Sequence, residues 1–317
     1  MKCRTNARLL GLAISAAGLA LSVAGATLAA GGTAQAQGVP EHIVPGAKPS
    51  PFIQEHKKQG PAPFEMVDPK VFRVCADPRD MPYSNTKGEG FENKIANLLA
   101  KALHKSVAYT WYPNAPGFVR KTLALYKCDI IMGVPQGDDI VQVTNPYYRS
   151  VYALVFKPGH GFDGVDTLSD PRLKDKRIGV IAGTPPASYL VRYHLMAKAK
   201  PYPLVVDTRY SSSAGKMMHD LVAGDIDVGV LWGPLAGYYA RHAGVPVTVV
   251  PLLKEKNGPH MSYRIGMGVR YSDQIWKRQL NRQLRKEQPA ITAMLLSYGV
   301  PLLDENKHLI KPPAKSP

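Results

Sequence analysis

Short apolar runs alternate along this chain with segments of helical periodicity. Val71 to Cys75 predicts a buried strand that ends before Asp77-Pro78, because proline cannot donate to a sheet ladder. After a polar loop, the apolar positions at 91–103 recur every three or four residues, which predicts an amphipathic helix. A strand, an exposed loop and a helix make the first half of a βαβ unit. In open α/β sheets such a loop lies at the carboxyl end of the strand, where ligands bind.

The same alternation continues through the rest of the chain. Apolar runs predict further strands at 107–111, 129–134, 151–156, 177–181, 203–207, 226–231, 247–251 and 264–269. Helices are predicted at 117–126, after the turn 183–186, and at 216–222, 273–288 and 290–297. This order is typical of an α/β protein.

Two parts of the chain repeat one pattern. The stretches YKCDIIMGVP and AGDIDVGVLWG each contain a helix end, an Asp, an apolar strand and a loop with Gly or Pro. Such a repeat favours two similar βαβ lobes over one long sheet. Because the chain then returns to its first part, two hinge crossings would join the lobes, with a cleft between them. The expected boundaries are 71–156 plus 251–317 for lobe 1 and 157–250 for lobe 2.

The N-terminal part has a different composition. Three basic residues precede a long apolar run at 9–30, and Ala34-Gln35-Ala36 matches the small-x-small pattern of a signal peptidase site. We therefore predict a signal peptide at 1–36 and a periplasmic mature protein. A membrane anchor is the alternative, since the run is long enough to span a bilayer, but it is rich in Ala and Gly rather than Leu. The Pro-rich stretch 37–70 lacks periodicity and predicts an extended arm.

The charge of the chain is strongly positive. Removal of the signal peptide would lower the formal charge from +16 to +13, because it takes away Lys2, Arg4 and Arg8 and no acidic residue. A basic protein attracts acidic partners. Nucleic acid is disfavoured by export and by the lack of basic stretches interleaved with aromatic residues. An acidic protein surface, an anionic membrane surface, or a surface that only keeps the protein soluble remain as interpretations.

The mature chain would keep two cysteines, Cys75 and Cys128. An oxidising compartment favours a disulfide between them. Against it, parallel neighbouring strands in simple register would hold the two Cα atoms too far apart, so two buried thiols are the alternative.

Acidic side chains in the predicted loops raise the question of catalysis. Glu89, Glu92, Asp138 and Asp139 could supply a carboxylate pair for acid–base chemistry. The sequence shows no nucleophile elbow, no Gly-rich phosphate loop and no pair of histidines at metal-ligand spacing. We therefore predict a protein that is not an enzyme and has no cofactor or metal of its own.

Several blocks of the chain carry a family resemblance. In order, they are VCADPRDMPYSN, GEGFENKIANLLAKAL, CDIIMGVPQG, TNPYYRS, GTPPASYL, LVAGDIDVGVLWGP and YGVP. This order resembles a type II periplasmic solute-binding protein along almost the whole mature chain. VCADP with PYSN, GFEN, GFVRKTL, CDIIMGVP and PYYRSVYALVF resemble more narrowly the MxaJ/XoxJ type, which is associated with PQQ-dependent methanol dehydrogenases.

One loop departs from the wider fold. Amino-acid-binding members usually carry an Arg after the third strand that binds the ligand carboxylate in a bidentate manner. Here that loop reads Pro135-Gln136-Gly137-Asp138-Asp139, with no arginine and two acids. A small cationic or neutral ligand, or no tight ligand, is therefore favoured over an amino acid.

The loops at the predicted cleft supply the candidate site residues. They are Asp77, Tyr83, Asn85, Glu89, Glu92, Pro135, Gln136, Thr144, Tyr148, Thr184 and Trp232. Several have a structural alternative. Asp77 can form an Asx turn, Glu92 suits the first turn of a helix, and Thr184 can cap one. Trp232 can pack between the lobes instead of stacking on a ligand, and Thr144 and Tyr148 have turn and core roles as alternatives.

The helix predicted at 273–288 has two faces. Trp276, Leu280 and Leu284 share the apolar one. Arg278, Arg282 and Arg285 share the other, which is the candidate partner surface. A merely solvated basic face is its alternative.

The resemblance implies an accessory protein that engages a quinoprotein methanol dehydrogenase for its activation or maturation, with PQQ and calcium or a lanthanide in that partner. The alternative is a receptor of an ABC transporter that delivers a small solute to a permease. No nucleic acid and no stable membrane anchor are expected.

Overall fold

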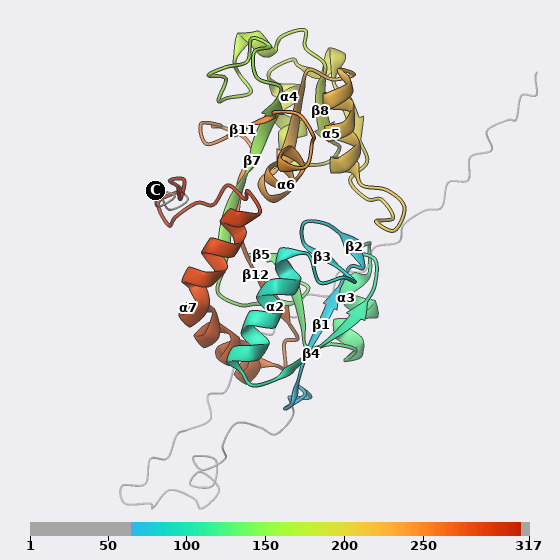
Figure 1. Ribbon diagram of the computed structural model, residues 1–317, viewed down its shortest axis with the longest axis vertical. Helices are drawn as coiled ribbons and strands as arrows, with labels where there is room; N and C mark the ends of the chain where they lie inside the picture. The colour runs from blue at the N-terminus through green and yellow to red at the C-terminus, as the bar shows by residue number, and fades with distance from the viewer. Residues whose placement is uncertain (1–64, 312–317) are drawn as a thin grey trace, which may run out of the picture. The chain divides into compact units, whose positions relative to one another are not determined.

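Strands and helices alternate through residues 65–311, the part of the chain that the computed structural model describes (Figure 1). The expected signal peptide and residues 37–64 of the expected arm lie outside this part. Residues 65–70 of that arm are described. They lead directly into the first strand.

A ten-stranded sheet forms the centre of the described chain, with the order β4-β1-β5-β12-β7-β10-β8-β9 and with β6 and β11 at its side. The strands are β1 (Val71–Ala76), β4 (Ser106–Trp111), β5 (Ile130–Pro135), β6 (Gln142–Val143), β7 (Tyr148–Phe156), β8 (Ile178–Ile181), β9 (Lys200–Tyr202), β10 (Val228–Trp232), β11 (Thr248–Pro251) and β12 (Ser262–Val269). A separate hairpin pairs β2 (Arg79–Asp80) with β3 (Ser84–Asn85).

Two parallel sets make up this sheet. In the first, β1 pairs in parallel with both β4 and β5, and in the second β8 pairs in parallel with both β10 and β9. These are the two βαβ lobes that the sequence repeat predicts. Hydrogen bonding nevertheless continues from one set to the other, so the preference for separate lobes over one long sheet was only partly right.

Strand β7 is the reason for this continuity. Its first residues, Tyr148–Val151, pair antiparallel with β12. Farther along β7, Tyr152–Phe156 pair with β10 on one edge, and Ala153–Phe156 pair with β11 on the other. Figure 1 shows β7 as a long strand that runs from beside β12 to beside β11. The chain leaves the first set through β7 and returns through β12, and these are the two predicted crossings.

Six α-helices cover the described chain, and three of them differ from prediction. They are α2 (Phe91–Ala102), α3 (Phe118–Lys121), α4 (Pro185–Arg192), α5 (Ser213–Ala223), α6 (Gly233–Arg241) and α7 (Gln274–Ser297). The helix predicted at 117–126 is only α3 followed by a 3₁₀ turn, since the Thr122 hydroxyl bonds to the Phe118 carbonyl. Helix α6 was not predicted. Pro234 lies in its first turn, where proline is tolerated.

Helix α7 replaces the two helices predicted on either side of Pro289. Its apolar face continues past the proline, with Ile291 and Leu295 buried in line with Leu284. The predicted burial of Trp276 on this face is also confirmed, and its ring packs edge-on against Phe72 at a centroid distance of 5.6 Å. Burial of this long face outweighs the hydrogen bond that proline cannot make.

The strand predicted at 203–207 is wrong. The sheet edge is β9, which ends at Tyr202 just before Pro203, a residue without an N–H to donate. Leu204 and Val205 are more than half exposed instead of buried. The apolar run therefore belongs to a surface loop beside the cavity described below.

Cys75 and Cys128 are joined in a disulfide with a Cα–Cα distance of 5.5 Å. The sequence left this bond open because strand neighbours in simple register would lie too far apart. In the structure the partner of Cys75 across β1 and β5 is Ile131, and Cys128 lies before β5 begins. The chain approaches β5 through a left-handed residue at Tyr126, which brings Cys128 to Cys75.

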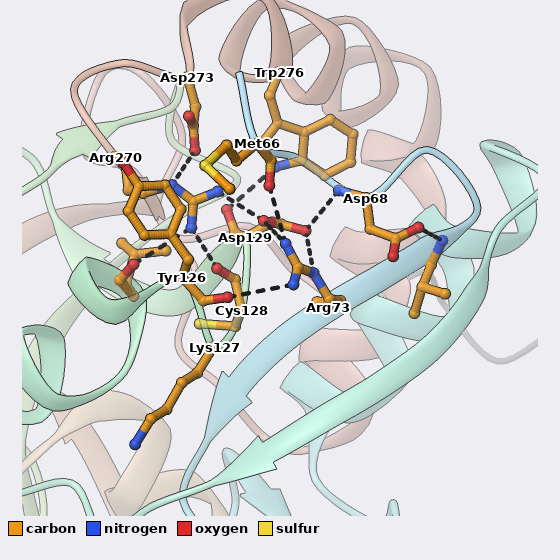
Figure 2. Close-up of polar contacts among 12 residues, drawn as sticks. Met66, Asp68, Arg73, Tyr126, Lys127, Cys128, Asp129, Arg270, Asp273 and Trp276 are labelled. Atoms are coloured by element: carbon orange, nitrogen blue, oxygen red, sulfur yellow. Dashed lines mark hydrogen bonds and ion pairs between the residues drawn. The ribbon is translucent and has the colours of Figure 1, made fainter. Parts of the chain in front are cut away.

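An ion cluster fixes the start of β5 (Figure 2). Asp129 is almost fully buried and accepts hydrogen bonds from Arg73 at 2.7 and 2.8 Å and from Arg270 at 2.7 Å. Arg270 also lies 2.7 Å from the carboxylate of Asp273, which directly precedes α7. Both guanidinium groups point toward Asp129 in Figure 2. The cluster ties β1, β5 and α7 together at the strand ends opposite the predicted site.

Candidate functional site

A cavity of about 1180 Å³ opens at the carboxyl ends of β1 and β5. Its lining comes from both parallel sets: the loop after β1, the loop after β5, the end of β10, and the segment between β9 and α5. The position matches the rule that open α/β sheets bind ligands beyond the carboxyl ends of their strands.

Seven of the eleven predicted site residues line this cavity. They are Asp77, Tyr83, Glu92, Pro135, Tyr148, Thr184 and Trp232. The other four predicted residues are absent from the lining, because their side chains bond to neighbours. Asn85 donates to Glu89 at 2.8 Å, and Gln136 donates to the Thr144 carbonyl at 2.6 Å. The Thr144 hydroxyl accepts from the Met267 N–H of β12 at 2.9 Å.

Asp77 closes one side of the cavity. Its Oδ1 accepts from the Arg79 N–H at 2.8 Å, so the Asx turn considered from the sequence is present. Its Oδ2 accepts from the Asn114 N–H at 2.6 Å and from the Thr208 hydroxyl at 2.7 Å. Thr208 lies between β9 and α5, so Asp77 connects the two parallel sets. Arg79 adds a second such link by donating to the Arg209 carbonyl at 2.9 Å.

Two other acids face the cavity with raised pKa values. Glu92 is nine-tenths buried, and burial, aided by the charge of Asp80, raises its pKa to about 8. Burial among the cavity walls and the charge of Asp77 raise the pKa of Asp80 to about 7. Both carboxyls therefore stay protonated at pH values well above those at which a solvent-exposed carboxyl ionises. The sequence did not single out Asp80, because nothing in the loop places it near a helix residue twelve positions later.

Glu92 lies in the first turn of α2, as the sequence allowed. Gly133 makes room for its carboxylate, since a Cβ at that glycine would lie 2.7 Å from Glu92 Oε1. In the described part of the chain, the Glu92 carboxyl has no hydrogen-bond partner, and the influences on its pKa are burial and Asp80 alone. The side chain therefore presents a bare carboxyl to the cavity.

Aromatic rings form much of the wall. Trp232 packs edge-on against Tyr152 at 5.2 Å and Tyr263 at 5.9 Å, and Phe91 packs against Tyr83 at 5.3 Å and Tyr148 at 6.2 Å. Trp232 thus packs against β7 and β12, the packing role considered from the sequence, and also lines the cavity. Burial raises the pKa of Tyr83 and Tyr148, so both phenols stay neutral.

Thr184 lies at the N-cap position of α4, yet it does not cap the helix. Its hydroxyl donates to the Ile181 carbonyl at 2.6 Å and accepts no helix N–H. The capping interpretation was therefore wrong. The Thr184 side chain lines the cavity, and its hydroxyl already donates its hydrogen bond to the last residue of β8.

The predicted partner surface lies on α7, away from the cavity lining. Arg278, Arg282 and Arg285 are exposed, while Leu280 and Leu284 on the other face are buried. Within residues 65–311, none of the three arginines forms an ion pair or a side-chain hydrogen bond. Their charges face solvent as the helical spacing predicted.

Neither a metal centre nor a membrane span is evident at residues 65–311. No group of three or more His, Cys, Asp or Glu side chains in that part could hold a metal ion. None of its helices combines the length and the apolar character needed to cross a bilayer.

Comparison with known proteins supports the resemblance. No family model matches the chain. Protein MoxJ of Methylorubrum extorquens AM1 is 31% identical over 250 residues, which are 74% of this chain and 83% of MoxJ. The crystal structure of the periplasmic binding protein XoxJ from Methylobacterium extorquens AM1 has 44% identity and a TM-score of 0.64, covering 74% of this chain and all of XoxJ.

The crystal structure of MxaJ from Methlophaga aminisulfidivorans MPT is also similar, with 29% identity, a TM-score of 0.63, and coverage of 73% of this chain and all of MxaJ. The TM-scores of 0.64 and 0.63 show that this chain shares the fold of these proteins. The chain therefore belongs to the MoxJ family and is an MxaJ/XoxJ-type binding protein with the type II periplasmic binding protein fold.

Proposed function

We propose that this protein is a periplasmic, non-enzymatic accessory that engages a PQQ-dependent methanol dehydrogenase during its activation or maturation. The observation that carries the proposal is the 44% identity to XoxJ along the whole of that chain. PQQ and its metal, calcium or a lanthanide, belong to the dehydrogenase. The residues of this chain supply binding surfaces only.

Two features of the described chain support a role as a protein partner. The loop after β5 lacks the arginine with which amino-acid receptors hold a carboxylate, and Pro135 in that loop is exposed. Helix α7 presents Arg278, Arg282 and Arg285 with no acidic partner among residues 65–311. A strongly basic exported protein with such a surface suits an acidic partner, and the association should weaken in salt.

The test is capture of the dehydrogenase by the mature protein, residues 37–317, from periplasmic extract at low and high salt. We expect mass spectrometry to identify a quinoprotein methanol dehydrogenase that high salt removes. The triple variant R278E/R282E/R285E should lose it. The matched control K174E/K198E/K216E changes three exposed lysines elsewhere by the same total charge and should retain it. Absence of a quinoprotein dehydrogenase at both salt concentrations would refute the proposal.

The cavity supports a second candidate, the receptor of a transporter for a small solute. Its volume of about 1180 Å³ and the bare Glu92 carboxyl are features that a ligand would use. A small molecule that co-purifies with the protein while no dehydrogenase is retained would favour this function over the first.

A further inference from the structure

The bare carboxyl of Glu92 is a feature that partner binding through α7 does not use. A carboxyl that is nine-tenths buried normally has hydrogen-bond partners, because an unmet polar group in the interior is costly. Glu92 has none among the described residues and lines the cavity. Its oxygens are therefore free for a donor that enters the cavity.

A second acid adds to the same site. Asp80 is close enough that its charge raises the pKa of Glu92, and it lines the same cavity. Two arginines also line the cavity. Arg79 donates to the Arg209 carbonyl, and Nη2 of Arg120 lies beside Gly117, which is itself part of the lining. Among residues 65–311, neither arginine pairs with the Glu92 or Asp80 carboxyl, so these two acids have no basic partner there.

The walls decide what kind of cation fits. Residues 65–311 offer no set of three metal-ligating side chains. Trp232 and Tyr152 instead present aromatic rings, whose faces attract organic cations. Thr184 has its hydroxyl proton committed to Ile181, so it can offer only an oxygen lone pair. Carboxylates, aromatic faces and acceptor oxygens together suit an ammonium group carried on an apolar body.

We propose that the cavity is a binding site for a small organic ammonium compound, with the charged nitrogen held by the Glu92 and Asp80 carboxylates and the apolar part against Trp232 and Tyr152. The site is independent of the α7 surface. It therefore holds whether the protein is a dehydrogenase accessory or a transport receptor.

Binding must release protons, because the cation pairs with ionised carboxylates that are largely protonated near neutral pH. Affinity should rise with pH up to the pKa values and fall below them, by up to about tenfold per pH unit for each proton released. The titratable groups around this acid pair are Asp77, Tyr83, Tyr109, Tyr147, Tyr148 and Tyr239.

The test is calorimetric titration of the mature protein with benzylammonium and, as the neutral analogue of the same shape, benzyl alcohol. We expect benzylammonium to bind at least tenfold more tightly than benzyl alcohol at pH 8, and at least tenfold more tightly at pH 8 than at pH 6. Glu92→Gln should weaken benzylammonium binding at least tenfold. Glu89→Gln, which removes an acid outside the cavity, should leave the affinity unchanged.

The proposal is overturned if benzylammonium gives no heat of binding at millimolar concentration, if benzyl alcohol binds equally well, or if Glu92→Gln retains the wild-type affinity. Capture of the dehydrogenase by Glu92→Gln, measured in parallel, separates this inference from the proposed function. That capture should match the wild type, because Glu92 lies in the cavity and the arginines on α7.

Discussion

Replacement of Glu92 by Gln should stabilise the fold at alkaline pH and leave it nearly unchanged in acid. The pKa of this carboxyl rises from an ordinary value of 4.5 to about 8 in the folded protein. An acid with a raised folded pKa binds its proton more tightly when folded. Stability therefore falls as pH rises from the unfolded to the folded pKa. Gln keeps the shape of the side chain but never ionises, so it avoids this loss.

The magnitude follows from the shift. One pKa unit corresponds to about 1.4 kcal/mol, so the loss in unfolding free energy is about 1 kcal/mol at pH 5 and about 4 kcal/mol at pH 8. The unfolding free energy of Glu92→Gln, measured relative to the wild type, should therefore be about 3 kcal/mol higher at pH 8 than at pH 5. Asp80→Asn should also raise the unfolding free energy at alkaline pH, because it removes a charge that raises the pKa of Glu92.

The assay is urea unfolding of wild type and variant at pH 5, 6, 7 and 8, followed by tryptophan fluorescence. Glu89→Gln is the control. It removes one negative charge from the same segment but outside the cavity, so it separates the loss of a charge from the loss of the buried carboxyl. A Glu92→Gln difference that stays constant with pH, or a variant less stable than the wild type at pH 8, would refute the reasoning.

Three further predictions concern the frame around the cavity. Cys75→Ser with Cys128→Ser should lower the unfolding free energy by about 2–4 kcal/mol in urea, because the closed loop no longer constrains the unfolded chain. Asp129→Asn should lower it by about 3–5 kcal/mol, since the buried Arg270 and the partly exposed Arg73 lose their shared carboxylate. An unchanged urea midpoint would contradict the role of this cluster. Thr208→Val should cost about 1–2 kcal/mol and speed amide exchange at 203–211, because Asp77 loses its partner there. Exchange at the wild-type rate would exclude that link.

Local patterns alone were enough to predict most of the architecture. Apolar runs predict β1, β5 and β10, and apolar spacing predicts α2 and α7. They do so because the burial of one face of a strand or helix requires apolar residues at a regular spacing in the sequence. The exceptions have local causes. Pro203 ended a strand early, and the buried face of α7 carried the helix past Pro289.

The tertiary structure alone decided which polar residues share the cavity and what state they take. The sequence placed Glu92 at a helix start and gave no role to Asp80 or Thr208. The fold brings Asp80 to Glu92 and Thr208 to Asp77, and it bonds Cys75 to Cys128. Periodicity predicts which residues of a strand or helix are buried, but not which residues from distant parts of the chain contact them. The pKa of a carboxyl depends on those contacts, because its burial and its neighbouring charges arise only when the chain has folded.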